Sequence, residues 1–128
     1  MSTPDLLSTS YSLGEKTGTT TFYMGHGRTG EWKLTGLSLV PTQAISADGS
    51  NKFVIAVTET AGSGTVCTSF DTSSTALVAG TGVQFTMTTT AGTDAEFGPT
   101  DSIKLVCTET GTATLDAVFY AHWQKVRA

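Results

Sequence analysis

Short runs of apolar residues alternate with polar ones along this chain, and no stretch shows the three- and four-residue spacing of an amphipathic helix. From Val83 to Thr88 every second residue is apolar, which is the period of a strand with one face in water. Turn-forming residues separate the runs. About eight strands are predicted, over residues 17–24, 31–40, 53–57, 66–70, 76–79 (a short strand or a turn), 83–88, 103–107 and 115–123. This number fits an all-β, jelly-roll-like antiparallel β-sandwich.

One predicted strand changes its inward face partway along. Trp32 and Leu34 share one face of it, whereas Leu37 and Leu39 lie on the other. Gly36 stands between the two pairs, which indicates a β-bulge at this position.

The run from Phe53 to Val57 is apolar on both faces. A strand with one wet face would alternate with polar residues, so this pattern predicts a central strand that is covered on both sides.

The first residues look different from the rest. Residues 1–14 are mainly polar, and Leu6, Leu7 and Tyr11 are taken as the anchors of this segment. They are predicted to form an N-terminal arm on a sandwich domain of residues 15–128, with these three side chains as candidates for contact with a partner.

The composition narrows the classes of partner. The 128 residues fit one domain, with 38% hydrophobic residues, 14% charged residues and a net charge of −4. Lys and Arg are dispersed, which argues against a nucleic-acid surface. No apolar run reaches membrane-spanning length, and the first residues lack the basic and apolar regions of a secretory signal. Synthesis in the cytosol is therefore expected. The low number of charges fits a domain that stays soluble without many charges, or one that buries much of its surface against partners.

The chain has two cysteines, Cys67 and Cys107, each flanked by Val and Thr. Two cysteines could form a disulfide, but a reducing cytosol favours buried free thiols within strands, and this is the prediction.

A glycine-rich loop formally matches the dinucleotide fingerprint through Gly25, Gly27 and Gly30. That fingerprint must open a helix, whereas a predicted strand follows here. The glycines are expected to supply positive φ angles in a loop. His26 and Arg28 at its tip are candidates for contact with a partner.

Catalytic, metal-binding and cofactor-binding residues are not predicted. His26 and His122 are the only histidines, and neither has another ligand at metal-binding spacing. The carboxylates of Asp94, Glu96 and Asp101 match no known calcium loop. The acidic residues sit mostly in predicted loops, where solubility and turn formation explain them. We expect a non-enzymatic protein.

The large aromatic residues admit three interpretations. Trp32 and Trp123 are core residues, platforms for sugar rings, or anchors in a subunit interface, and Tyr23 and Tyr120 share these alternatives. His122 lies beside Trp123 and is predicted to be a structural or interface residue.

From Phe22 onward the order of features resembles a family of small tailed-phage virion proteins. These have a jelly-roll-like sandwich and decorate or cement the outside of the head. The segments that carry the resemblance are Phe22-Tyr23, Val40-Pro41 with the connection to Asn51, the strand Phe53–Val57 with its Gly-Ser-Gly turn, residues 101–106, and Thr110-Gly111-Thr112-Ala113 with the closing strand.

The resemblance implies a virion component on the outer capsid surface, made in the host bacterial cytoplasm. It implies binding to the major capsid protein and homo-oligomerisation, with a trimer favoured, and no catalytic residues. The ending after Tyr120, with His122 and Trp123, is unlike the family and leaves the C-terminal contact open. Two alternatives stand beside this hypothesis: a carbohydrate-binding or adhesion module of a head or tail fibre that binds surface glycans, and a hydrolase.

Overall fold

The computed structural model describes residues 6–60, 64–88 and 96–127, and within them it is all-β, as predicted. No helix in this part of the chain is long and apolar enough to cross a membrane. The strands are β1 (Leu6–Ser12), β2 (Thr20–Met24), β3 (Glu31–Pro41), β4 (Lys52–Glu59), β5 (Thr65–Asp71), β6 (Val83–Gln84), β7 (Glu96–Phe97), β8 (Ile103–Thr110) and β9 (Ala117–Arg127).

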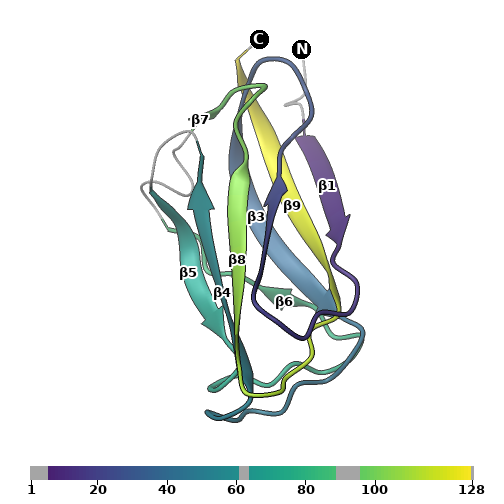
Figure 1. The fold of residues 1–128 in the computed structure, drawn as a ribbon. Coiled ribbons are helices and arrows are strands. Elements are labelled where there is room, and N and C mark those ends of the chain that lie inside the picture. The colour runs from purple at the N-terminus through teal and green to yellow at the C-terminus, as the bar shows by residue number, and fades with distance from the viewer. Residues whose placement is uncertain (1–5, 61–63, 89–95, 128) are drawn as a thin grey trace.

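The strands pair as a jelly roll (Figure 1). Sheet I has the order β1-β9-β3-β6, with β7 also paired to β3, and sheet II has the order β2-β8-β4-β5. The pairs β1·β9, β2·β8, β3·β6 and β4·β5 are nested as in one long hairpin. The pairs β3·β9 and β4·β8 roll that hairpin into two packed sheets. The predicted jelly-roll-like sandwich is therefore confirmed.

The core lies between the two sheets. Side chains at alternate positions of each strand point into it, as in β4, where Phe53, Ile55 and Val57 are buried. Phe119 and Trp123 of β9 face them from the other sheet and are among the largest buried side chains. A sandwich of this size therefore needs no metal or disulfide to hold its core.

The predicted bulge at Gly36 is confirmed. The pairing of β3 with β9 shifts register between Leu34 and Gly36. The shift lets Leu34 and Leu37 both face the core although their numbers differ by an odd count.

The predicted N-terminal arm is, from Leu6 to Ser12, an edge strand of the sandwich. β1 pairs with β9 along its whole length, from Leu6 opposite Gln124 to Ser12 opposite Val118. A separate arm is therefore wrong for these residues, and residues 1–5 lie outside the described part. Leu7, Thr9 and Tyr11 form the inward row of this strand. The strand was not predicted because Leu6, next to Leu7, breaks the alternation of apolar and polar residues in the sequence.

The predicted strand at residues 83–88 contributes to both sheets. Val83 and Gln84 pair with β3, and the chain then crosses to β5. There the Thr68 N–H donates to the Thr86 carbonyl at 2.8 Å, and the Thr88 N–H donates to the Val66 carbonyl at 3.1 Å. The possible strand at residues 76–79 is only a single bridge between Leu77 and Ile45, and β7 lies in the predicted loop 91–100.

Cys67 and Cys107 are free and buried, as predicted. Burial raises the pKa of each thiol from 9.0 to about 12, because the thiolate would lose its hydration.

Candidate functional site

His26 is a buried structural residue and not the tip of an open loop. Its ring Nε2 lies 2.9 Å from the Phe97 carbonyl and 2.8 Å from the Gly98 carbonyl, and its Nδ1 accepts the Arg28 backbone N–H at 3.1 Å. The two carbonyls require a donor at Nε2 and the Arg28 N–H requires an acceptor at Nδ1, and these roles correspond to the Nε2–H tautomer. His26 therefore ties the glycine loop to β7 and is not available to a partner, whereas the Arg28 side chain is exposed.

The glycine-rich loop has the geometry of a turn. Gly27 and Gly30 have φ angles of 68° and 85°, which supports the structural interpretation of these two residues. The strand β3 follows the loop directly, so the helix that a dinucleotide site requires is not at this position.

Both tryptophans are core residues at the same end of the sandwich. The Trp32 indole N–H donates to the Thr29 carbonyl at 2.9 Å, and the Trp123 indole N–H donates to Thr9 Oγ1 at 3.0 Å. The His26 ring lies between them, with its centroid 5.7 Å from that of Trp32 and 5.5 Å from that of Trp123. Of the three interpretations of these two residues, the core one holds, because each is at most 5% exposed and leaves almost no side-chain surface for an interface or a sugar.

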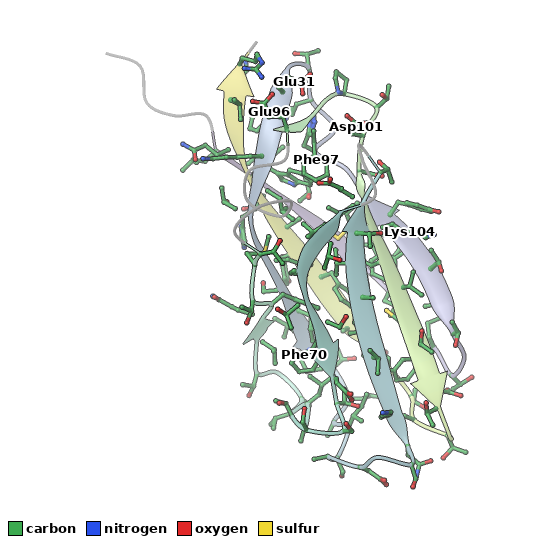
Figure 2. All side chains as sticks on the ribbon, turned by 90° about the vertical axis from the view of Figure 1, so that its left-hand side faces the viewer. Glu31, Phe70, Glu96, Phe97, Asp101 and Lys104 are labelled. Atoms are coloured by element: carbon green, nitrogen blue, oxygen red, sulfur yellow. The ribbon has the colours of Figure 1, made fainter. Side chains whose placement is uncertain are left out.

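Acidic side chains gather at this end as well, where Figure 2 shows Glu31, Glu96 and Asp101. Asp101 accepts the Gly98 N–H at 2.9 Å, and Glu96 pairs with Arg127. Among the described residues no group of three or more potential metal ligands comes together, and Asp94 lies outside them.

Two other carboxylates serve turns, as expected. Asp48 accepts the Ser50 N–H at 2.7 Å and Asp71 accepts the Ser73 N–H at 2.8 Å. These bonds lower the pKa of both side chains below 3.8, since they favour the ionised form. In Asp71 the nearby Lys52 lowers the pKa further.

The outer face of sheet I is polar and rich in hydroxyl groups. His122 lies exposed on it, with Nδ1 hydrogen-bonded to Ser8 Oγ at 2.8 Å. His122 is therefore a surface residue, and its predicted interface role stays a prediction. Beside it Gly36 has no side chain, and a hollow of about 320 Å³ opens over Ser38 and Gln84.

The outer face of sheet II is different, because its centre is apolar. Opposite the buried row of β4 lie Val54 and Ala56, and Ala56 pairs across to Val106 of β8. All three are half-buried, whereas the inward row of β4 is buried. The prediction that β4 is central in its sheet is confirmed, but the described chain buries only one of its faces. We call this surface the sheet II face; it comprises Thr21, Tyr23, Val54, Ala56, Thr58, Lys104, Val106 and Thr108.

Tyr23 is the large exposed side chain of the sheet II face. It is 55% exposed and lies opposite Lys104 in the pairing of β2 with β8. An apolar centre with an exposed tyrosine and few charges has the composition of a protein interface. In the sequence this face was indicated by β4, which is apolar on both faces. That pattern predicted a layer covering each face but not whether the layer belongs to this chain or to a partner.

The predicted contact residues of β1 fall on two sides of the strand. Leu6 is 74% exposed and shares the outer face of sheet I with His122, whereas Leu7 is half-buried against the core. Tyr11 lies at the open edge between the sheets, where its ring stacks on Phe22 with centroids 4.4 Å apart.

Comparisons of this chain with protein-family models, with curated proteins and with solved structures give no match.

Proposed function

We propose that this protein is a structural virion component that binds the outer surface of a phage capsid and stabilises the head as a decoration or cement protein. The major capsid protein is the proposed partner, and the role is one of binding without catalysis. Jelly rolls recur in viral capsid proteins and in lectins, so the fold is compatible with this role and does not decide it.

One observation supports the proposal most directly. Strand β4 is apolar on both faces, and the described chain buries only the row of Phe53, Ile55 and Val57. The exposed row is therefore the natural place for a partner, because burying Val54 and Ala56 removes apolar surface from water. Val54, Ala56 and Val106 at the centre of the sheet II face are uncharged, and the charges around them are Lys104 and the ion pair of Lys52 with Asp71, which lies opposite Val54. Docking centred on Ala56 therefore desolvates few ions.

The distribution of aromatic side chains favours this role over the carbohydrate-binding alternative. A sugar platform needs exposed aromatic rings that lie together. Tyr23 lies on sheet II, Tyr120 on the outer face of sheet I, and Tyr11 at the edge between the sheets. Both tryptophans are buried. The hydrolase alternative would need a carboxyl with a raised pKa, whereas the shifts at Asp48 and Asp71 go down.

The proposed location is the outside of the virion after synthesis in the bacterial cytoplasm. The two buried thiols are consistent with a reducing compartment. If neighbouring copies on the capsid lattice are linked, their combined avidity for the capsid would exceed the affinity of a single copy.

The test is co-sedimentation of the purified protein with capsids assembled without it. Ala56→Asp places a charge at the centre of the sheet II face and is expected to weaken capsid binding at least tenfold, because the carboxylate would be desolvated on docking. Ser38→Asp is the matched control: Ser38 is also half-buried on an outer face, but of sheet I, and binding should stay within about twofold.

Equal thermal midpoints of the two variants would show that both are folded. Capsid binding by Ala56→Asp at the wild-type level would contradict docking through the sheet II face. Failure of the wild-type protein to bind capsids would contradict the proposed function as a whole and would direct attention to glycans.

A further inference from the structure

Among the described residues, the strand β1 is a sheet edge without the usual protection. Natural edge strands are blunted by charges, proline, bulges, shortness or a covering segment. β1 is 7 residues long, contains neither a charged residue nor proline, and pairs with β9 without a register shift. Within the described residues it has a strand partner on one side only, and it lies at one margin of the molecule (Figure 1).

The backbone groups that face this open edge can be identified. The Leu13 N–H donates to the Ala117 carbonyl at 3.0 Å and continues the ladder between β1 and β9. Backbone groups of alternate residues in an antiparallel strand point to opposite sides. Residues at odd positions of β1 therefore bond to β9. The backbone N–H and C=O groups directed to the open edge belong to Leu6, Ser8, Ser10 and Ser12.

Two apolar side chains on the inward side of β1 are incompletely covered at this edge. Leu7 is half-buried against the core, and Tyr11 is 38% exposed although its ring stacks on Phe22. A strand added beside β1 would cover both.

We propose that β1 pairs antiparallel with β1 of a second copy of this chain, about a two-fold axis through Thr9 that joins the two copies of sheet I. In this register Ser8 faces Ser10 of the second copy and Leu6 faces its Ser12. The two-fold axis repeats each of these pairs, so four facing pairs form and all outward backbone groups of the strand are paired. With two hydrogen bonds for each facing pair, this gives about eight N–H···O hydrogen bonds. A two-fold axis through a serine instead would leave an end of the strand unpaired.

The side chains complement one another in the same register. Leu7 of each copy lies beside Tyr11 of the other, at the closely spaced positions where cross-strand contacts are strongest. The strand has no charge, so its self-pairing brings no like charges together despite the net charge of −4. A second copy is the favoured occupant because one isologous contact satisfies both edges at once.

The contact is small, so we expect a weak dimer with a dissociation constant on the order of tens of micromolar. It leaves the sheet II face open and does not rest on the proposed function. It generates dimers, whereas the resemblance to phage decoration proteins implies a trimer, and the mass of the assembly distinguishes them.

Sedimentation equilibrium of the full chain, from about 1 µM to 1 mM, tests the contact. The wild-type protein should pass from monomer to dimer. Ser10→Pro removes one outward N–H and none of the bonds to β9, and it should weaken dimerisation at least tenfold. Ser10→Thr keeps the N–H and should dimerise within about threefold of wild type. A wild-type protein that stays monomeric, a trimer, or a dimer insensitive to Ser10→Pro would overturn the proposal.

Disulfide trapping tests the register. Facing hydrogen-bonded residues have Cα atoms about 5.5 Å apart, within the range of a disulfide. A mixture of Ser8→Cys and Ser10→Cys chains should therefore crosslink on mild oxidation at least tenfold more than either chain alone. The native thiols are buried and should not compete. Equal crosslinking in the mixture and in the single variants would contradict the register centred on Thr9.

Discussion

The two lateral sides of the sandwich are built differently. On one side β5 is covered by the segment at residues 86–88, and β6 and β7 have 2 residues each. On the other side β1 and β2 end their sheets with 7 and 5 residues and no covering strand in the described chain. The same fold thus closes one side with its own chain and leaves the other side open in the described part of the chain.

Among the single substitutions, the largest effect should come from removing the residue that anchors β7. His26→Ala deletes the donor to the Phe97 and Gly98 carbonyls and leaves buried groups unpaired, so it should lower the free energy of unfolding by about 3 kcal/mol. Arg28→Ala is the control, because its side chain is exposed and its backbone N–H is kept; a change below about 0.5 kcal/mol is expected. Urea unfolding measures both, and a loss below about 1 kcal/mol in His26→Ala would contradict the anchoring role.

The buried thiols should make the protein sensitive to alkali. Between pH 9 and 12 an unfolded chain loses each thiol proton, whereas the folded protein, with both pKa values raised to about 12, keeps it. The free energy of unfolding should therefore fall as pH rises through this window, by about 1.4 kcal/mol per pH unit for each thiol.

The control for this prediction is the double variant Cys67→Ala, Cys107→Ala. Other titrating groups are common to both proteins, so the wild-type stability should fall more steeply than that of the variant. Parallel curves of stability against pH would show that the thiols are not protected by burial. Because Cys67 lies on β5, its reaction with a thiol reagent also reports opening of the covered side.

Proline placed on the two edges compares the sides directly. The Thr68 N–H bonds to Thr86, so Thr68→Pro breaks the cover of β5 and should lower the free energy of unfolding by about 2 kcal/mol. In the monomer Ser10→Pro removes an outward N–H and should lower it by less than about 0.5 kcal/mol. Denaturant unfolding at low protein concentration measures both variants. Equal losses in the free energy of unfolding would contradict the view that the β5 edge is covered and the β1 edge is open.

The smallest effect is expected for the hydrogen bond between Ser8 and His122. It is exposed, and water can replace it, so Ser8→Ala should change the free energy of unfolding by less than about 0.5 kcal/mol. A shift of the thermal midpoint that corresponds to more than about 1 kcal/mol would show that β1 depends on this bond for its docking.

Local pattern predicted much of the fold and little of the site. The change of face around Gly36 revealed a bulge, and strict alternation found most strands, because both depend only on neighbours in sequence. His26 was misinterpreted because its partners, Phe97 and Gly98, are some 71 residues away. Trp32 and Trp123 carry no local mark of burial, since a tryptophan fits a core and an interface equally well.

The sheet II face shows where sequence reasoning stops for physical reasons. The apolar row of Val54 and Ala56 predicted a cover on both sides of β4. Whether such a cover comes from the same chain or from a partner is a property of the assembled fold. β1 was missed for a related reason: a strand of hydroxyl residues gains its stability from its pairing with β9 and not from its own composition.

The most direct test of the proposed role is the number of copies of this protein in purified virus particles from its source, determined by quantitative peptide mass spectrometry. A decoration or cement protein should be present in hundreds of copies per particle. Absence from the particles would contradict a virion role, and a dozen copies or fewer would contradict attachment over the head surface.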